Sequence, residues 1–352
     1  MLLRLMICLM VLGVGVVGAF DSTIPVVDLN DYYHPEKKQK FVEDVAKALH
    51  EIGFFAVINT GVDQDALQAA YRASEEFFST PLEYKNEIYA PELNGQRGYV
   101  PGETAQGFAT KDFKELVHIG RAKNLWPQWM DLQSPMTHLM DVLDQYAQIL
   151  EGVFSLAIGE NEDFLPEMSK GGECLLRTLH YPQNPDSGRL WAARHTDIDL
   201  FTILPAATEE GLQVFHDGEW ISVKVPANAF IVNGGDMLQN LTNGYFKSAI
   251  HQVVAKPNVE RYSIVYFIHP RDEDSLSPTE KSIALTGGVQ HYPEATRVEL
   301  LACRLRELGV ASPSLLEFER NSQIMQRIQI LVESGQAALP VQKTYDIWLK
   351  SQ

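Results

Sequence analysis

Cysteine is scarce in this chain of 352 residues, which contains only Cys8, Cys174 and Cys303. Three cysteines so widely separated form neither a disulfide framework nor the spacing of a zinc-binding motif. Basic residues are also few, since 29 Lys and Arg stand against 46 Asp and Glu for a formal net charge of −17. Nucleic-acid binding usually requires a basic surface, so the composition predicts that nucleic acid is not a partner.

Long hydrophobic runs are rare too, and the single one lies at the N-terminus. Residues Leu5 to Val17 are continuously apolar, follow a short positively charged segment, and are followed by small residues. This pattern is typical of a secretory signal peptide, which we expect to cover residues 1–19. The mature chain would then be exported, either periplasmic or secreted; without cleavage it would be cytoplasmic. No similar run recurs, so the mature chain is not expected to span a membrane.

The remaining length and composition indicate a globular protein. An apolar content of 45% provides for a substantial core. No internal repeat, low-complexity segment or linker marks a boundary, so we expect one compact unit with three regions. These are an N-terminal α/β region over residues 20–165, a barrel over residues 166–280 and a C-terminal helical region over residues 281–352.

Apolar periodicity and turn residues place the elements of the first region. Asp63 is the expected N-cap of one helix. A glycine-rich segment, residues 94–107, is expected to form a loop. The expected strands are Ile24–Leu29 and Phe54–Ile58, and the expected helices are Lys37–Ile52, Gln64–Ser79, a short one after Pro81, and Met136–Ile158.

From residue 174 the pattern changes to short β-rich runs separated by turn residues, which predicts a double-sheet barrel or jelly roll. Helices return after Pro270, at about residues 294–308 and 313–334. The expected strands are Cys174–Tyr181, Leu200–Leu204, Leu212–Phe215, Trp220–Val225, Ala229–Val232, Ser248–Ala255 and Tyr262–His269.

Three residues of this β-rich region have the chemistry of a metal site. His195 and Asp197 are two positions apart, so on one strand they would share a face. His251 lies far enough downstream to come from a neighbouring strand. Two histidines and one carboxylate form the facial triad of non-haem Fe(II) sites, which leaves positions open for O2 and a bidentate keto acid. Zinc is the competing metal, but a helical His-Glu-x-x-His is absent and iron is favoured.

A second pair, Arg261 and Ser263, also shares a strand face. The planar guanidinium of Arg261 matches a carboxylate bidentately, and the Ser263 hydroxyl adds a further donor. The alternative is an ion pair between Arg261 and one of the many acids of the chain. Phe267 lies on the same face by parity and is expected to line a substrate pocket.

With these residues in view, the chain resembles the isopenicillin N synthase-like group of 2-oxoglutarate/Fe(II) dioxygenases. The resemblance covers most of the chain after residue 19. The segments that carry it are Ile24–Leu29, Gly53–Asn59, Leu179–Pro182, His195–Asp197, Leu200–Leu204, Gly211–Val214, Val232–Gly244, Lys247–Ser248, His251 and Arg261–Ile264.

The resemblance implies a mainly β core with flanking helices, in the form of a distorted double-stranded β-helix. It also implies that His195, Asp197 and His251 bind Fe(II), and that Arg261 and Ser263 bind the distal carboxylate of 2-oxoglutarate, helped by Tyr181. Because Asp197 is present, hydroxylation or desaturation is favoured over halogenation. The sequence departs from the family pattern at Leu179, where many relatives carry Asn near the keto-acid end of the co-substrate, and at Thr60 and Gln252.

We therefore expect an enzyme that uses Fe(II), O2 and 2-oxoglutarate to oxidise a small organic substrate. Two alternatives stay open. In isopenicillin N synthase the equivalent Arg-x-Ser pair holds a substrate carboxylate, so this chain could be an Fe(II) oxidase that does not use 2-oxoglutarate. A barrel that binds a metal and an organic acid without turnover is the other. The sequence specifies neither the substrate nor the oligomeric state.

Overall fold

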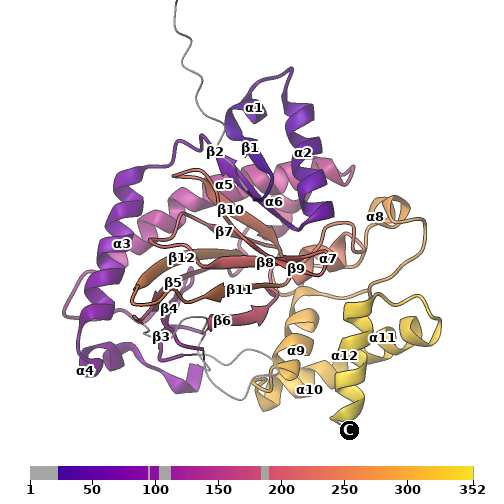
Figure 1. Cartoon of the computed structure of the whole chain (residues 1–352). Coiled ribbons are helices and arrows are strands. Elements are labelled where there is room, and N and C mark those ends of the chain that lie inside the picture. Colours follow the sequence, from indigo (N-terminus) through magenta and orange to yellow (C-terminus); the bar gives the residue numbers. More distant parts are fainter. Residues whose placement is uncertain (1–22, 94–95, 103–111, 184–189, 352) are drawn as a thin grey trace, which may run out of the picture.

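The computed structural model describes residues 23–93, 96–102, 112–183 and 190–351. The predicted signal peptide and parts of the predicted loop 94–107 lie outside these ranges. The described chain forms two β-sheets that face each other, with helices packed outside them (Figure 1). Within the described ranges, no helix is both long enough and apolar enough to cross a membrane.

The larger sheet has eight strands in the order β1-β2-β10-β7-β12-β5-β4-β3, and the smaller has four in the order β6-β11-β8-β9. Strand β1 pairs with β2 in parallel, whereas the other named pairs are antiparallel. Strands distant in sequence are neighbours in space, which confirms the predicted jelly-roll core with flanking helices. The bounds are β1 Val26–Asp28, β2 Phe54–Ile58, β3 Gly98–Val100, β4 Glu115–Ile119, β5 Leu175–Tyr181, β6 Leu190–His195, β7 Phe201–Leu204, β8 Leu212–His216, β9 Glu219–Ser222, β10 Phe230–Gly234, β11 His251–Val254 and β12 Arg261–Ile268.

The helices lie mainly before and after the barrel strands in sequence. The helix Gln64–Ser79 begins as predicted, because the Asp63 side chain accepts hydrogen bonds from the backbone N–H groups of Asp65 and Ala66. The bounds are α1 Leu29–Tyr33, α2 Lys38–Glu51, α3 Gln64–Ser79, α4 Leu82–Lys85, η1 Asn86–Ile88, η2 Pro91–Leu93, α5 Gln133–Ala157, α6 Phe164–Ser169, α7 Asp236–Leu241, α8 Glu280–Leu285, α9 Arg297–Glu307, α10 Pro313–Ser322, α11 Ile324–Glu333 and α12 Leu339–Lys350.

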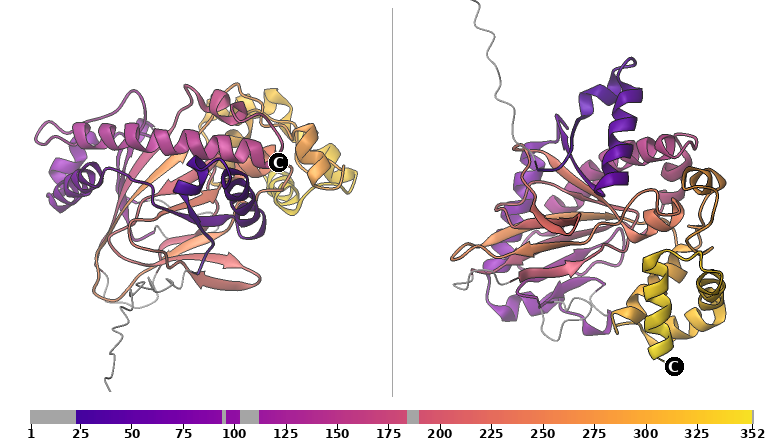
Figure 2. Two further views of the ribbon diagram at one scale, coloured as in Figure 1. Left: turned by 90° about the horizontal axis from the view of Figure 1, so that it is seen from above. Right: turned by 45° about the vertical axis from the view of Figure 1, so that its right-hand side comes forward.

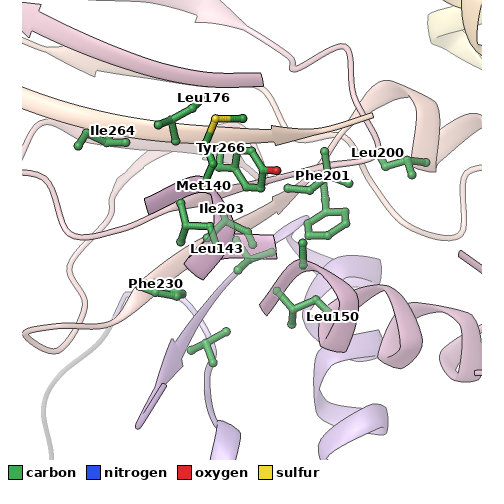
Figure 3. Packing of buried hydrophobic residues seen from close by; sticks show 14 of the residues in the cluster. Met140, Leu143, Leu150, Leu176, Leu200, Phe201, Ile203, Phe230, Ile264 and Tyr266 are labelled. Atoms are coloured by element: carbon green, nitrogen blue, oxygen red, sulfur yellow. The ribbon is translucent and has the colours of Figure 1, made fainter. Parts of the chain in front are cut away.

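One core fills the space between the larger sheet and the helices on its outer face. The long helix α5 crosses this face (Figure 2). Figure 3 shows Met140, Leu143 and Leu150 of α5 against strand residues such as Phe201 and Tyr266. The apolar side chains of α5 recur every three or four residues, so they form one stripe that packs on the sheet.

A second core lies between the two sheets. Strand β2 contributes to both cores, because Phe55 and Val57 face the helices whereas Phe54 and Ala56 face the barrel interior. A strand buried on both faces is apolar at successive positions, which explains the continuous apolar run of β2. The barrel interior between the sheets is where the candidate site lies.

The C-terminal helices form a third cluster of their own, built around Cys303, Ile324, Met325 and Ile328. The prediction of one helix over residues 313–334 is wrong in one respect. Gln323 adopts a left-handed backbone conformation with φ of 62°, so the segment divides into α10 and α11. The change of direction places Ile324, Met325 and Ile328 against α9 and α12 rather than in solvent.

Candidate active site

The two predicted histidine ligands lie on neighbouring strands. His195 is the last residue of β6 and His251 the first of β11, and the two are paired directly in the sheet register. The prediction that Asp197 lies on the same strand as His195 is wrong, because β6 ends at His195. The chain nevertheless returns the carboxylate to the two rings, and the Asp197 Oδ1 atom lies 3.7 Å from the Nε2 atom of each histidine.

Hydrogen bonds through Nδ1 orient both imidazoles so that each Nε2 atom points toward Asp197. The Nδ1 atom of His195 lies 2.8 Å from the Ala193 carbonyl oxygen, and that of His251 lies 3.1 Å from the Ala249 carbonyl oxygen. A carbonyl oxygen only accepts, so each Nδ1 carries the proton and each Nε2 keeps a lone pair. Burial, followed by the neighbouring His251, lowers the pKa of His195 to about 3, which keeps its ring neutral. Neutral imidazoles with oriented Nε2 atoms are suited to metal binding.

The two oxygens of the Asp197 carboxylate have different surroundings: Oδ2 accepts hydrogen bonds from the protein, and Oδ1 faces the two imidazoles. Its Oδ2 atom accepts hydrogen bonds from the Thr202 hydroxyl at 2.7 Å and from the Asn233 amide at 2.9 Å. Burial alone would raise the pKa of Asp197, but the two imidazoles and these donors outweigh it and lower the pKa. Asp197 is therefore an anion whose Oδ1 atom faces the two Nε2 atoms.

Asp199, two residues after Asp197, is a further acid close to the triad and is fully buried. Its Oδ2 atom lies 2.9 Å from the Thr202 hydroxyl oxygen, while Oδ1 has no hydrogen-bond partner. Burial, followed by the charge of Asp197, raises the pKa of Asp199 well above its ordinary value. The Thr202 hydroxyl therefore lies within hydrogen-bond distance of both carboxylates and links Asp199 to Asp197.

Arg261 is buried at the start of β12 with an incompletely satisfied guanidinium. It is 2% exposed, its Nε donates to the Glu209 carbonyl oxygen at 2.9 Å, and its Nη1 atom has no partner. No salt bridge joins it to an acidic side chain within the described ranges, which argues against a structural ion pair. A buried guanidinium without an anion is costly, so the arrangement fits an acidic ligand.

The other predicted residues line the same cavity. Tyr181 is opposite Arg261 in the sheet register, and its ring lies 4.9 Å from the centre of the guanidinium. Ser263 and Phe267 follow Arg261 on the same face of β12, as parity predicted. The lining residues are Phe54, Lys114, Arg177, Leu179, Tyr181, Ala192, His195, Asp197, Thr202, Leu204, Leu212, Asn233, His251, Val253, Arg261, Ser263, Val265 and Phe267.

Four polar residues of this cavity were not predicted from the sequence: Lys114, Arg177, Thr202 and Asn233. Asn233 carried a usable signal, because it continues the apolar run 229–232 and a polar residue in a buried strand needs a partner. The other three carried none, since their place in the cavity depends on strand register.

Comparison with known proteins agrees with this geometry. Residues 172–270 match the 2OG-Fe(II) oxygenase superfamily, and residues 24–137 match the non-haem dioxygenase in morphine synthesis N-terminal family. The 2-oxoglutarate-dependent dioxygenase traH of Penicillium crustosum is 30% identical over 294 residues, which cover 76% of this chain and 90% of that protein. The chain belongs to the 2OG-Fe(II) oxygenase superfamily.

Solved structures of similar proteins place this oxygenase in the same fold. A crystal structure from Caulobacter crescentus, of a protein assigned to the 2OG-Fe(II) oxygenase family, is 30% identical, with a TM-score of 0.74. It matches 82% of this chain over 99% of its own length. A full-length Neurospora crassa protein, crystallised in complex with alpha-KG, is 25% identical, with a TM-score of 0.72 over 80% of this chain and 96% of its own.

Membership of the superfamily makes the protein an oxidoreductase that uses Fe(II), 2-oxoglutarate and O2 on small-molecule substrates. The residues present fit these groups. The ligand atoms of His195, Asp197 and His251 all lie within 4.8 Å of one another, which is the one such cluster among the described residues. The buried Nη1 atom of Arg261 lacks a partner in the same cavity, as expected of a residue that binds a carboxylate.

Proposed function

We propose that this oxygenase couples the oxidative decarboxylation of 2-oxoglutarate to the hydroxylation or desaturation of a small organic substrate. Fe(II) with 2-oxoglutarate and O2 supplies the oxidising chemistry when bound, and 2-oxoglutarate leaves as succinate and CO2. One observation carries the proposal: two Nε2 atoms and one carboxylate oxygen converge in the cavity that also contains the unsatisfied guanidinium of Arg261.

The residues of the chain have distinct roles in this proposal. His195, Asp197 and His251 hold the iron, and the hydrogen bonds on their outward atoms keep the three ligand atoms in place. Arg261 and Ser263 bind the distal carboxylate of 2-oxoglutarate, and the Tyr181 ring supports the guanidinium. The apolar walls of the cavity limit the access of water to the reacting groups.

Anaerobic titration with Fe(II) tests the assignment. We expect one Fe(II) per chain and a visible charge-transfer band when 2-oxoglutarate is added. His195→Ala and Asp197→Ala should lose stoichiometric iron binding, because each removes one of three protein ligands. His216→Ala is the matched control, since His216 also stands beside an aspartate, Asp217, but does not line the cavity.

Two results would contradict the proposal. Wild-type iron affinity in both ligand variants would show that the metal binds elsewhere. Failure of the iron-loaded wild type to release succinate from 2-oxoglutarate would instead favour an oxidase in which Arg261 and Ser263 hold the carboxylate of the substrate.

A further inference from the structure

The segment that joins β7 to β8, residues 205–211, lies against the start of β12 and contacts the Arg261 side chain. The Nε atom of Arg261 donates to the Glu209 carbonyl oxygen at 2.9 Å, which fixes one edge of the guanidinium. The guanidinium carbon also lies 4.9 Å from the centre of the Tyr181 ring. The direction of the buried, unsatisfied Nη1 atom therefore depends on where this segment holds the Glu209 carbonyl group.

Thr208 ties the segment to β12 at the residue next to Arg261. Its hydroxyl oxygen accepts a hydrogen bond from the Tyr262 N–H group at 2.8 Å, and its own N–H group donates to the Tyr262 carbonyl oxygen at 3.1 Å. Glu209 follows Thr208 in the chain, and Tyr262 follows Arg261. The two hydrogen bonds of Thr208 therefore hold the Glu209 carbonyl group beside the Arg261 side chain.

Tyr71 ties the same segment to helix α3. Its hydroxyl donates to the Ala206 carbonyl oxygen at 2.9 Å, and its ring packs against the apolar core between the helices and the larger sheet. Burial raises the pKa of Tyr71 well above its ordinary value, so the hydroxyl keeps the proton that it donates. Residues 206 and 208 are thus attached to two different elements of the fold, and Glu209 comes directly after the second attachment.

Resting on the proposed function, we propose that Tyr71 and Thr208 are positioning residues for the co-substrate. Neither is among the residues that line the cavity, so each acts through the Glu209 carbonyl group on the orientation of the Arg261 guanidinium. The planar fork of a guanidinium binds a carboxylate through two parallel N–H groups, which requires the correct plane and direction. Loss of either attachment should therefore weaken binding of the distal carboxylate of 2-oxoglutarate and leave iron binding unchanged.

Titration of the iron-loaded protein with 2-oxoglutarate, followed by the charge-transfer band, tests the proposal. In Thr208→Val the Tyr262 N–H group loses its acceptor, so the Kd for 2-oxoglutarate should rise about fivefold or more. Tyr71→Phe removes one neutral hydrogen bond and should raise this Kd about threefold or more. Thr208→Ser keeps the hydroxyl and should restore binding to within about twofold. The Kd for Fe(II) should not change, and the loss should appear in the KM for 2-oxoglutarate rather than in kcat.

Two residues elsewhere in the fold provide matched controls. The Thr23 hydroxyl accepts from the Lys224 N–H group at 2.8 Å while the Thr23 N–H group donates to the Lys224 carbonyl oxygen at 3.2 Å, the same arrangement as at Thr208. The Tyr146 hydroxyl of α5 donates to the Thr60 carbonyl oxygen at 3.1 Å, as Tyr71 does to Ala206. Thr23→Val and Tyr146→Phe should therefore bind 2-oxoglutarate as the wild type does.

A second ligand separates the orientation of Arg261 from a general loosening of the site. 2-Oxopentanoate has the keto-acid end of 2-oxoglutarate but a methyl group in place of the distal carboxylate, so its Kd should be the same in wild type and variants. An equal rise in Kd for both acids, a comparable rise in the two controls, or an unchanged Kd in both Thr208→Val and Tyr71→Phe would each overturn the proposal. If the iron-loaded wild type binds no 2-oxoglutarate, the proposed function fails and this inference fails with it.

Discussion

At the scale of single residues, Arg261 is the side chain whose surroundings demand a ligand most clearly. Its guanidinium is buried, bonded through Nε to a carbonyl oxygen and unsatisfied at Nη1. Truncating a buried charge partner costs about 2–5 kcal/mol, so Arg261→Ala should weaken 2-oxoglutarate binding about thirtyfold or more. Arg261→Lys should recover only part, because an ammonium cannot form the fork. Titration of the charge-transfer band measures both, and unchanged affinity in Arg261→Ala would contradict the role.

Glu151 is a buried acid on helix α5 that does not line the cavity of the triad. It is 1% exposed on α5, and its Oε1 atom has no hydrogen-bond partner. Burial raises its pKa to about 8, so the folded protein binds a proton that the unfolded chain releases above its ordinary pKa of 4.5. Its contribution to stability is therefore fully present at low pH and is lost as the pH rises toward 8.

The corresponding prediction concerns the free energy of unfolding. Between pH 5 and pH 8, wild type should lose on the order of 4 kcal/mol more than Glu151→Gln, which cannot ionise. Urea unfolding at several pH values measures this difference. Glu36→Gln, at an exposed position, is the control and should follow wild type. Parallel pH profiles for wild type and Glu151→Gln would show that Glu151 is not protonated in the fold.

Some site residues could be predicted from the sequence, because their role follows from their order along the chain and from the alternation of side chains between the two faces of a strand. His195, His251 and the alternating face of β12 from Arg261 to Phe267 belong to this group. Arg177 and Thr202 could not be placed from the sequence. Each lines the cavity because its strand pairs with β12, and this pairing cannot be inferred from the residue type. The burial of Asp199 could not be predicted either, because it depends on close packing against the backbone at Gly235, a contact that local sequence does not reveal.

At the scale of elements, the bounds of helices and strands were predicted correctly where local sequence signals, such as an N-cap or an apolar run, agree with the burial of the segment in the fold. Strand β2 and helix α3 have the predicted bounds, since one is apolar on both faces and the other has an aspartate N-cap. Strand β4 was missed because it begins with the charged Glu115. That carboxylate is stabilised by distant partners, namely Lys85 at 2.8 Å and His180 at 2.7 Å, which local sequence does not reveal.

The start of α7 offers a test of close packing. Gly235 precedes this helix, and a Cβ atom at that position would lie 2.0 Å from the Oδ1 atom and 2.3 Å from the carbonyl oxygen of Asp199. Gly235→Ala should therefore destabilise the fold by several kcal/mol, beyond the roughly 1–3 kcal/mol of ordinary overpacking. Gly218→Ala is the comparison, because its Cβ would meet nothing within 4 Å and only its φ of 86° opposes the change. That variant should lose about 1–2 kcal/mol. Thermal unfolding of both measures the contrast, and equal losses would refute it.

At the scale of the whole molecule, the two sheets have different surroundings. The larger sheet is backed by α2, α3 and α5, whereas the smaller sheet has polar side chains outside, such as Gln213 and Gln252 bonded to each other at 2.8 Å. One wall of the cavity is therefore part of a thick apolar layer, and the other is a sheet with a polar outer face.

The N-terminal leader carries a prediction about the whole chain. The charged, apolar and small segments of residues 1–19 lead us to expect cleavage, with a mature protein that begins near Phe20. Intact-mass measurement on protein isolated from its own host would detect the loss of these residues. A full-length mass in the soluble fraction would contradict export and indicate a cytoplasmic enzyme.

The two-faced burial of β12 has a consequence for how this protein can change over generations. Arg261, Ser263, Val265 and Phe267 face the cavity, while Ile264, Tyr266 and Ile268 belong to the helix-backed core. Point substitutions at the cavity positions can alter ligand preference and leave the other layer intact. Gain or loss of one codon inside the strand would exchange the two sets, placing a guanidinium among aliphatic side chains. Inherited variation in β12 should thus consist of replacements and never of single-residue insertions or deletions.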